Sequence, residues 1–157
     1  MKERFLTRSA AILLLIRETA EGEELLLQRR ENTGYMDGYY DLSASGHVEK
    51  GESMIKTLIR EAKEEIGIDI SEENIEFVTM MHTNNFATDQ VYYNGFFKVT
   101  KYSGEVTLNE PTKCGELKWF KINELPQNIL QDRFQAIKNY IDNVKYSEFG
   151  WKCNEVI

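Results

Sequence analysis

The chain has 157 residues, of which 41% are hydrophobic, and its formal net charge at pH 7 is −7. This length suits one domain with a sizeable core, and the acidic balance excludes a protein that binds nucleic acid mainly through lysines and arginines at the phosphates. Two cysteines are too few for a disulfide framework, and the longest apolar run, residues 10–16, is shorter than the roughly 20 residues of a membrane-spanning helix. We therefore expect one globular domain, residues 1–157, in the cytoplasm and without a membrane or polymeric nucleic acid as partner.

The hydrophobic pattern predicts strands interspersed with two helices. Residues 10–16 are all apolar, as in a strand that is buried on both faces. Ser53 as N-cap and Gly67 as a left-handed C-terminal residue delimit a helix over residues 53–66, and a second amphipathic helix is expected over residues 129–144. Further strands are expected at residues 24–29, 39–44, 75–82, 91–102 and 117–122, a loop at 32–38 and a packed tail at 145–157. Five or more strands with two helices imply an α/β or α+β sandwich with a mixed sheet.

The first predicted helix carries three glutamates on one side. At about 100° per residue, Glu61, Glu64 and Glu65 share an arc of roughly 100° beside the apolar face of the helix. Like charges at this spacing repel each other, and the two glutamates nearest the C-terminus also oppose the helix dipole. A hard divalent cation such as Mg²⁺, which prefers carboxylate oxygens, would offset both effects. For such a short pattern taken alone, an ordinary solvated acidic face is the alternative.

The flanking residues extend this pattern into a longer motif. Gly46 and Gly51 bracket a loop that leads into the helix, where backbone carbonyls can approach an ion closely. Glu52 and Arg60 are spaced to pair and to brace that loop against the helix. The segment resembles the Nudix hydrolases, whose signature is G-x(5)-E-x(7)-R-E-U-x-E-E-x-G-U, with U a bulky aliphatic residue. The residues that match are Gly46, Glu52, Arg60, Glu61, Glu64, Glu65, Gly67 and Ile68, while Ala62 is small for a U position.

The resemblance implies a fold, a cofactor and a reaction. The fold is an α/β/α sandwich with a mixed β-sheet, and the cofactor is Mg²⁺ or Mn²⁺. The reaction is hydrolysis of a nucleoside diphosphate linked to another group, such as a nucleoside triphosphate, ADP-ribose or a nucleotide sugar. The resemblance assigns catalysis and metal binding to Glu61, Glu64 and Glu65, with the Gly46 carbonyl as a further ligand, and a structural brace to Glu52 and Arg60. We hypothesise that Glu61 is the general base, and the resemblance also allows a homodimer.

Several residues outside the motif are candidates with two interpretations each. Glu110 and Glu116 lie where the family often supplies another acidic metal ligand, but each can equally be a solvated loop residue. Arg29 and Arg30 end a predicted strand, where they either bind phosphate or form an exposed pair. Tyr35 either stacks on a nucleobase or belongs to the core or its rim.

The segment before the motif leaves the substrate open. Residues 41–47 resemble the Asp-x-Ser-x-x-Gly-His segment of relatives that include isopentenyl-diphosphate isomerases, and His47 within it either contacts a diphosphate or bonds inside its loop. Those isomerases use a cysteine upstream of the motif, whereas the first cysteine here is Cys114. An isomerase-like enzyme and a non-catalytic nucleotide-ligand sensor are therefore the alternatives, although a sensor usually lacks some of the motif carboxylates that this chain retains.

Overall fold

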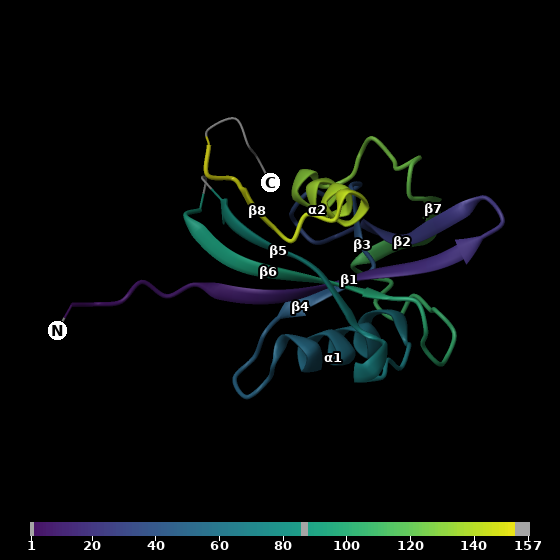
Figure 1. Ribbon diagram of the computed structural model, residues 1–157, viewed down its shortest axis with the longest axis horizontal. Helices are drawn as coiled ribbons and strands as arrows, with labels where there is room; N and C mark the ends of the chain where they lie inside the picture. The colour runs from purple at the N-terminus through teal and green to yellow at the C-terminus, as the bar shows by residue number, and fades with distance from the viewer. Residues whose placement is uncertain (1, 86–87, 153–157) are drawn as a thin grey trace.

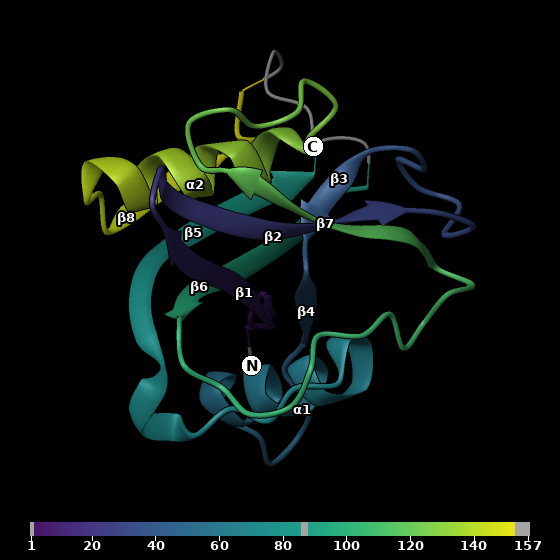
Figure 2. The ribbon, with the colours of Figure 1, turned by 90° about the vertical axis from the view of Figure 1, so that its right-hand side faces the viewer.

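The computed structural model describes residues 2–85 and 88–152, which form a mixed eight-stranded sheet with a helix on each side (Figure 1, Figure 2). The strands are β1 (Arg8–Thr19), β2 (Gly22–Arg30), β3 (Tyr40–Leu42), β4 (Ala44–His47), β5 (Glu76–Asn85), β6 (Gln90–Val99), β7 (Cys114–Lys121) and β8 (Tyr146–Phe149). The helices are α1 (Met54–Ile66) and α2 (Gln131–Asp142), with a short 3-10 helix at Glu72–Asn74. Figure 1 shows α1 below the sheet and α2 above it, so the predicted α/β/α sandwich with a mixed sheet is confirmed. Neither helix in this part of the chain has the length and apolar character needed to cross a membrane.

Strand β1 lies at the centre of the sheet and contributes to both cores. It pairs in parallel with β6, antiparallel with β4, and antiparallel with β2 at its far end. Its even-numbered side chains from Ile12 to Ile16 pack in the cluster that contains α2, and its odd-numbered side chains from Ala11 to Leu15 pack in the cluster that contains α1. The prediction of a strand covered on both faces is confirmed, and it explains why an alternating pattern is absent here.

Truncation of β1 is expected to destabilise the fold strongly. Leu14 is 0% exposed, so Leu14→Ala removes buried methyl groups and leaves a cavity in the α2 core, at an expected loss of about 2–5 kcal/mol in the free energy of unfolding. Urea unfolding of the two proteins measures the difference. Glu73→Ala, at an exposed position, is the control, with an expected change below about 0.5 kcal/mol. A Leu14→Ala variant as stable as the control variant would contradict this description of the core.

Helix α1 begins and ends where the sequence predicts. The hydroxyl oxygen of Ser53 accepts a hydrogen bond from the Lys56 amide at 3.2 Å, which caps the first turn. Gly67 adopts the left-handed conformation, with φ of 72°, and its amide bonds the carbonyl of Lys63 at 3.2 Å. The face of the helix that includes Leu58 and Ala62 is buried against the sheet.

Other element boundaries differ from the prediction for local reasons. The second helix is shorter than residues 129–144, because the Leu130 amide bonds the Tyr40 carbonyl at 3.0 Å and Asn143 ends the helix in the left-handed conformation with φ of 56°. The single strand expected at 39–44 is two strands, β3 and β4, interrupted at Ser43, and β4 continues to His47. Strand β6 ends at residue 99 instead of 102.

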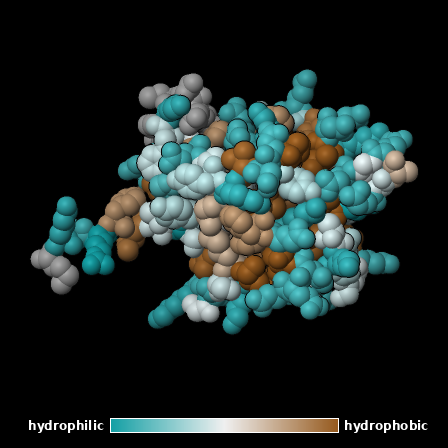
Figure 3. Space-filling view, in the orientation of Figure 1, coloured by the Kyte–Doolittle hydropathy of each residue, from teal (hydrophilic) through white to brown (hydrophobic). Residues whose placement is uncertain are grey.

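The two ends of the chain differ in their packing. Strand β8 pairs in parallel with β5, and the indole nitrogen of Trp151 donates to the His82 carbonyl at 2.9 Å. The predicted packed tail is therefore confirmed up to this point, and residues 153–157 lie outside the described residues. At the other end, residues 2–7 extend away from the sheet, with Phe5 72% and Leu6 86% exposed. Elsewhere on the face shown in Figure 3, hydrophilic side chains predominate and apolar ones gather in the middle, over the sheet.

Candidate active site

The motif residues meet where β4 runs beside α1. One carboxylate oxygen of Glu65 accepts a hydrogen bond from the Ser45 amide at 2.8 Å. Gly46 lies directly against Glu61, since a Cβ atom at residue 46 would overlap the Glu61 carboxylate. The backbone of β4 at Gly46 and the carboxylates of Glu61 and Glu65 on α1 thus form one continuous surface. This close approach explains why glycine is required at the first motif position.

The Glu52–Arg60 pair ties the loop before α1 to the helix. Arg60 Nε donates to Glu52 Oε2 at 2.7 Å, and Arg60 Nη2 donates to Glu52 Oε1 at 2.9 Å, so the pair is bidentate. The same carboxylate accepts hydrogen bonds from the Glu49 amide at 3.1 Å and the Thr57 hydroxyl at 3.2 Å. The Arg60 guanidinium lowers the pKa of Glu52 to about 2. The geometry is that of a brace, as the resemblance implies.

Arg60 also contacts two of the predicted metal ligands. Its Nη1 donates to Glu61 Oε1 at 2.8 Å and to Glu64 Oε2 at 3.4 Å, and Glu64 is the more exposed of the two, at 54% of its side chain. Across residues 2–85 and 88–152, no three acidic, histidine or cysteine side chains are already arranged around a single ion position. A cation shared by Glu61 and Glu64 would therefore replace Arg60 Nη1 at these two carboxylates.

The electrostatics of the carboxylates nevertheless fit a divalent cation. Burial raises the pKa of Glu65 to about 8, the Ser45 amide lowers it in part, and the charges of Glu61 and Glu110 raise it again. Burial likewise raises the pKa of Glu61, against the lowering effect of Arg60. A desolvated carboxylate such as Glu65, which is bonded by the neutral Ser45 amide, is costly, and hard oxygen donors are the ligands that Mg²⁺ and Mn²⁺ prefer. The donor set thus fits the metal that the resemblance implies.

The two acidic candidates outside the motif lie in different places. The amide of Asn109 donates to the backbone carbonyl of Glu65 at 3.2 Å, so the loop that carries Glu110 runs beside the end of α1, and the charge of Glu110 raises the pKa of Glu61 and of Glu65. Glu116 lies on β7, where it accepts a hydrogen bond from the Tyr40 hydroxyl at 2.8 Å and lies 3.9 Å from Arg29 Nη1. Of the two, the structure brings Glu110 to the motif.

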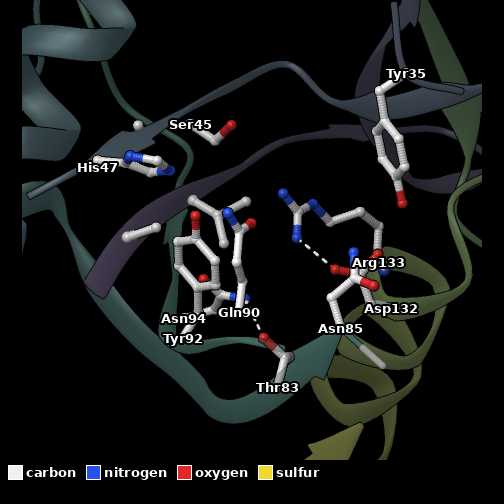
Figure 4. A pocket seen from close by; sticks show the side chains of 13 residues that line it. Tyr35, Ser45, His47, Thr83, Asn85, Gln90, Tyr92, Asn94, Asp132 and Arg133 are labelled. Atoms are coloured by element: carbon white, nitrogen blue, oxygen red, sulfur yellow. Dashed lines mark hydrogen bonds and ion pairs between the residues drawn. The ribbon is translucent and has the colours of Figure 1, made fainter. Parts of the chain in front are cut away.

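A cavity of about 370 Å³ opens beside β4, on the side of the sheet that α2 covers (Figure 4). Gly46 and His47 form part of its wall, and Tyr35 lies across the cavity from His47. Arg30 is outside this lining, where it donates to the Tyr35 carbonyl at 2.9 Å and to Asp41 at 3.3 Å. Arg29 borders a second, more open depression with Arg30. The structure therefore brings Tyr35 and His47 to one cavity and leaves the arginine pair beside it.

Polar residues outside the motif complete the cavity. They come from β5, β6 and the first turn of α2, and are Thr83, Asn85, Gln90, Tyr92, Asn94, Asp132 and Arg133. The one sequence feature that could have pointed to these residues is the adjacent acidic and basic pair, Asp132 and Arg133, at the start of the second predicted helix. Its position opposite β4 depends on the strand order, which the pattern of residues does not give.

The fold and this site define a Nudix-type α/β protein. A family model described as NUDIX domain matches residues 6–140, so the chain belongs to this family.

The individual relatives have low sequence identity with this chain. The chain is similar to dihydroneopterin triphosphate diphosphatase of Escherichia coli, at 31% identity over 86 residues, which are 55% of this chain and 54% of that protein. It is also similar to the NAD-capped RNA hydrolase NudC of Stutzerimonas stutzeri, at 29% identity over 118 residues, 75% of this chain and 38% of that protein. The chain thus spans about half the length, or less, of these curated relatives. A crystal structure of a MutT NUDIX hydrolase from Burkholderia pseudomallei has a TM-score of 0.76 and 21% identity, covering 86% of this chain and 98% of the other, which shows the shared fold.

Proposed function

We propose that the chain hydrolyses the phosphoanhydride bond of a nucleoside diphosphate linked to another group, with Mg²⁺ or Mn²⁺ as cation. One observation carries this proposal: the desolvated Glu61 and Glu65 lie against β4, beside a cavity that Gly46 also lines. The names of the two relatives support it, because a pterin triphosphate and an NAD cap both contain a phosphoanhydride bond.

The residues that would hold the cation are Glu61, Glu64 and Glu65 with the Gly46 carbonyl, and Glu110 from the neighbouring loop; Glu116 stays a weaker prediction. When bound, the cation would neutralise phosphate charge and lower the pKa of a water molecule. Glu61, whose carboxylate lies directly against Gly46, is our candidate for the base that accepts the proton. Tyr35 and His47, which line the cavity, are our candidates for contacts with the substrate, and Arg29 and Arg30 stay predictions for phosphate contacts.

A substrate panel with and without chelator tests the proposal. The panel contains nucleoside triphosphates, dihydroneopterin triphosphate, ADP-ribose, nucleotide sugars, dinucleoside polyphosphates, and both NAD and NAD-capped RNA. We expect Mg²⁺-dependent release of phosphate, pyrophosphate or monophosphate from at least one compound, loss of the rate to background in excess EDTA, and recovery with added Mg²⁺. No turnover of any compound, or a rate that EDTA leaves unchanged, would contradict the proposal. No turnover together with intact metal binding would favour the non-catalytic sensor or the isomerase-like enzyme.

We propose a small molecule as substrate in preference to RNA. The net charge of −7 opposes binding of a long polyanion, whereas one diphosphate needs only the local cation. Faster turnover of NAD-capped RNA than of NAD in the panel would contradict this choice. The homodimer and the cytoplasmic location also stay predictions.

A further inference from the structure

Two buried carboxylates fix the orientation of Arg133 at the start of α2. Arg133 Nε donates to Asp41 Oδ1 at 2.8 Å, and Arg133 Nη1 donates to Asp132 Oδ2 at 2.7 Å. Asp41 and Asp132 are each only 2% exposed, and Asp41 also binds Arg30 at 3.3 Å. With two anchors on different elements, the planar guanidinium is held in one plane at the end of the cavity.

This arrangement leaves hydrogen-bond donors for a ligand. A guanidinium has five N–H donors, of which the two anchors use one on Nε and one on Nη1. Arg133 Nη2 has no hydrogen-bond partner among the residues that the structure describes. Figure 4 shows the guanidinium reaching into the cavity, with one edge toward Asp132 and the other toward the side where Tyr92 and Gln90 lie. Of the three remaining donors, one on Nη1 and one on Nη2 form a coplanar pair at the tip of the guanidinium, which Figure 4 shows facing the cavity.

The charge around Arg133 argues against a phosphate as its ligand. The positive charges of Arg133 and Arg30 are balanced by the negative charges of Asp41 and Asp132, so a further anion would meet no surplus positive charge. The cavity wall that faces Arg133 includes the uncharged side chains of Asn94 and Thr83, and Asn94 donates to the Thr83 hydroxyl at 3.3 Å. A neutral wall, an aromatic ring at Tyr92 and unused planar donors suit an uncharged heterocycle.

We propose that Arg133 binds the edge of a fused ring on which a carbonyl oxygen and a ring-nitrogen acceptor lie side by side. Guanine and hypoxanthine present this edge, and arginine is known to pair with guanine in a bidentate manner. Pterins share the same chemistry. Adenine places an amino donor where the carbonyl would be, so it opposes the guanidinium with a donor. The inference rests on the proposed function and names its substrate class as 6-oxopurine or pterin phosphate esters.

Isothermal titration of the whole protein with monophosphates, in metal-free buffer, tests the inference without turnover. The ligands are GMP, IMP, AMP, 7-deaza-GMP and neopterin monophosphate. We expect GMP and IMP to bind about tenfold tighter than AMP, and 7-deaza-GMP, which lacks the ring acceptor, to bind more weakly than GMP. Neopterin monophosphate binding more tightly than GMP would assign the site to pterins, and weaker binding would assign it to purines.

A variant separates recognition from a purely structural role. Arg133→Lys keeps a positive charge between Asp41 and Asp132 but lacks the planar fork, so we expect the GMP-to-AMP preference to fall to near unity. Arg17→Lys, at the exposed end of β1, is the matched control and should keep the preference. If Arg133→Lys does not fold, the comparison of GMP, AMP and 7-deaza-GMP with the unmodified protein decides alone. Equal affinity for GMP and AMP, no binding of any ligand, or an unchanged preference in folded Arg133→Lys would overturn the inference.

The outcome is independent of the hydrolysis panel. A preference for GMP without hydrolysis of any substrate would refute the proposed reaction and leave the ring assignment standing. Hydrolysis with equal kcat/KM for GTP and ATP would support the reaction and refute the ring assignment.

Discussion

Glu65→Gln is expected to lower kcat by roughly 10²–10⁴-fold while leaving the fold intact. Glutamine keeps the size of the side chain and an oxygen that can accept the Ser45 hydrogen bond, now at 2.8 Å, but it has no charge with which to hold a cation. Glu64→Gln should cause a similar loss, because it also removes a charge that would hold the cation. The fold should be kept, since Glu64 is half exposed and contributes little to packing. Steady-state kinetics with the best substrate of the panel measure both variants. Glu73→Gln, on the exposed 3-10 helix, is the matched control and should retain the full rate.

The stability of the Glu65→Gln variant has a predicted sign. Burial raises the pKa of Glu65 from 4.5 to about 8, so in the metal-free protein its ionisation costs stability progressively as the pH rises through this interval. Removing the charge should therefore give a Tm in EDTA at pH 8 equal to or above that of the unmodified protein. A lower Tm would assign the loss of activity to unfolding, and full activity in both Glu64→Gln and Glu65→Gln would exclude the carboxylate site.

Gly46→Ala is expected to lower activity about 10²-fold or more. The added Cβ would overlap the Glu61 carboxylate, so Glu61 must leave its position 2.8 Å from Arg60 or β4 must move away from α1. A displacement of about 1 Å of a catalytic group is enough for a loss of this size. Kinetics and thermal melting of the variant separate the loss of rate from a loss of fold.

The control for Gly46→Ala is Ser43→Ala, in the same segment of chain. Ser43 is buried, and its hydroxyl has no hydrogen-bond partner among the described residues, so its removal should leave kcat unchanged. Equal activity of Gly46→Ala and Ser43→Ala would show that the close approach of β4 to Glu61 has no role in the reaction.

The part of the site on α1 was predictable because its determinants are local. The caps at Ser53 and Gly67, and the shared direction of the glutamates, follow from helix geometry over a few residues. The spacing of Glu52 and Arg60 predicted that they pair, and the resemblance supplied a ligand role for the Gly46 carbonyl. The direct contact between Gly46 and Glu61 is known only from the structure. The structure adds that Arg60 also bonds Glu61 and would have to yield that bond to a cation.

The cavity was not predictable because its residues are distant in the sequence. Asp41 and Arg133 are 92 residues apart and meet only because β3 lies beside the start of α2. The position of Glu116 has a similar cause: the pairing of β2 with β3 and β7 sets both Tyr40 and Glu116 against Arg29. Strand order and register decide such contacts, and neither is encoded in a short motif.

Titration of Mn²⁺ followed by electron paramagnetic resonance tests most directly whether Glu61, Glu64 and Glu65 hold a divalent cation. The unmodified protein should bind Mn²⁺ with an affinity at least about 100-fold higher than that of a variant in which all three are glutamine. Mg²⁺ should compete for the same site. Equal Mn²⁺ affinity in the two proteins, with both folded, would contradict a cation site built from these carboxylates.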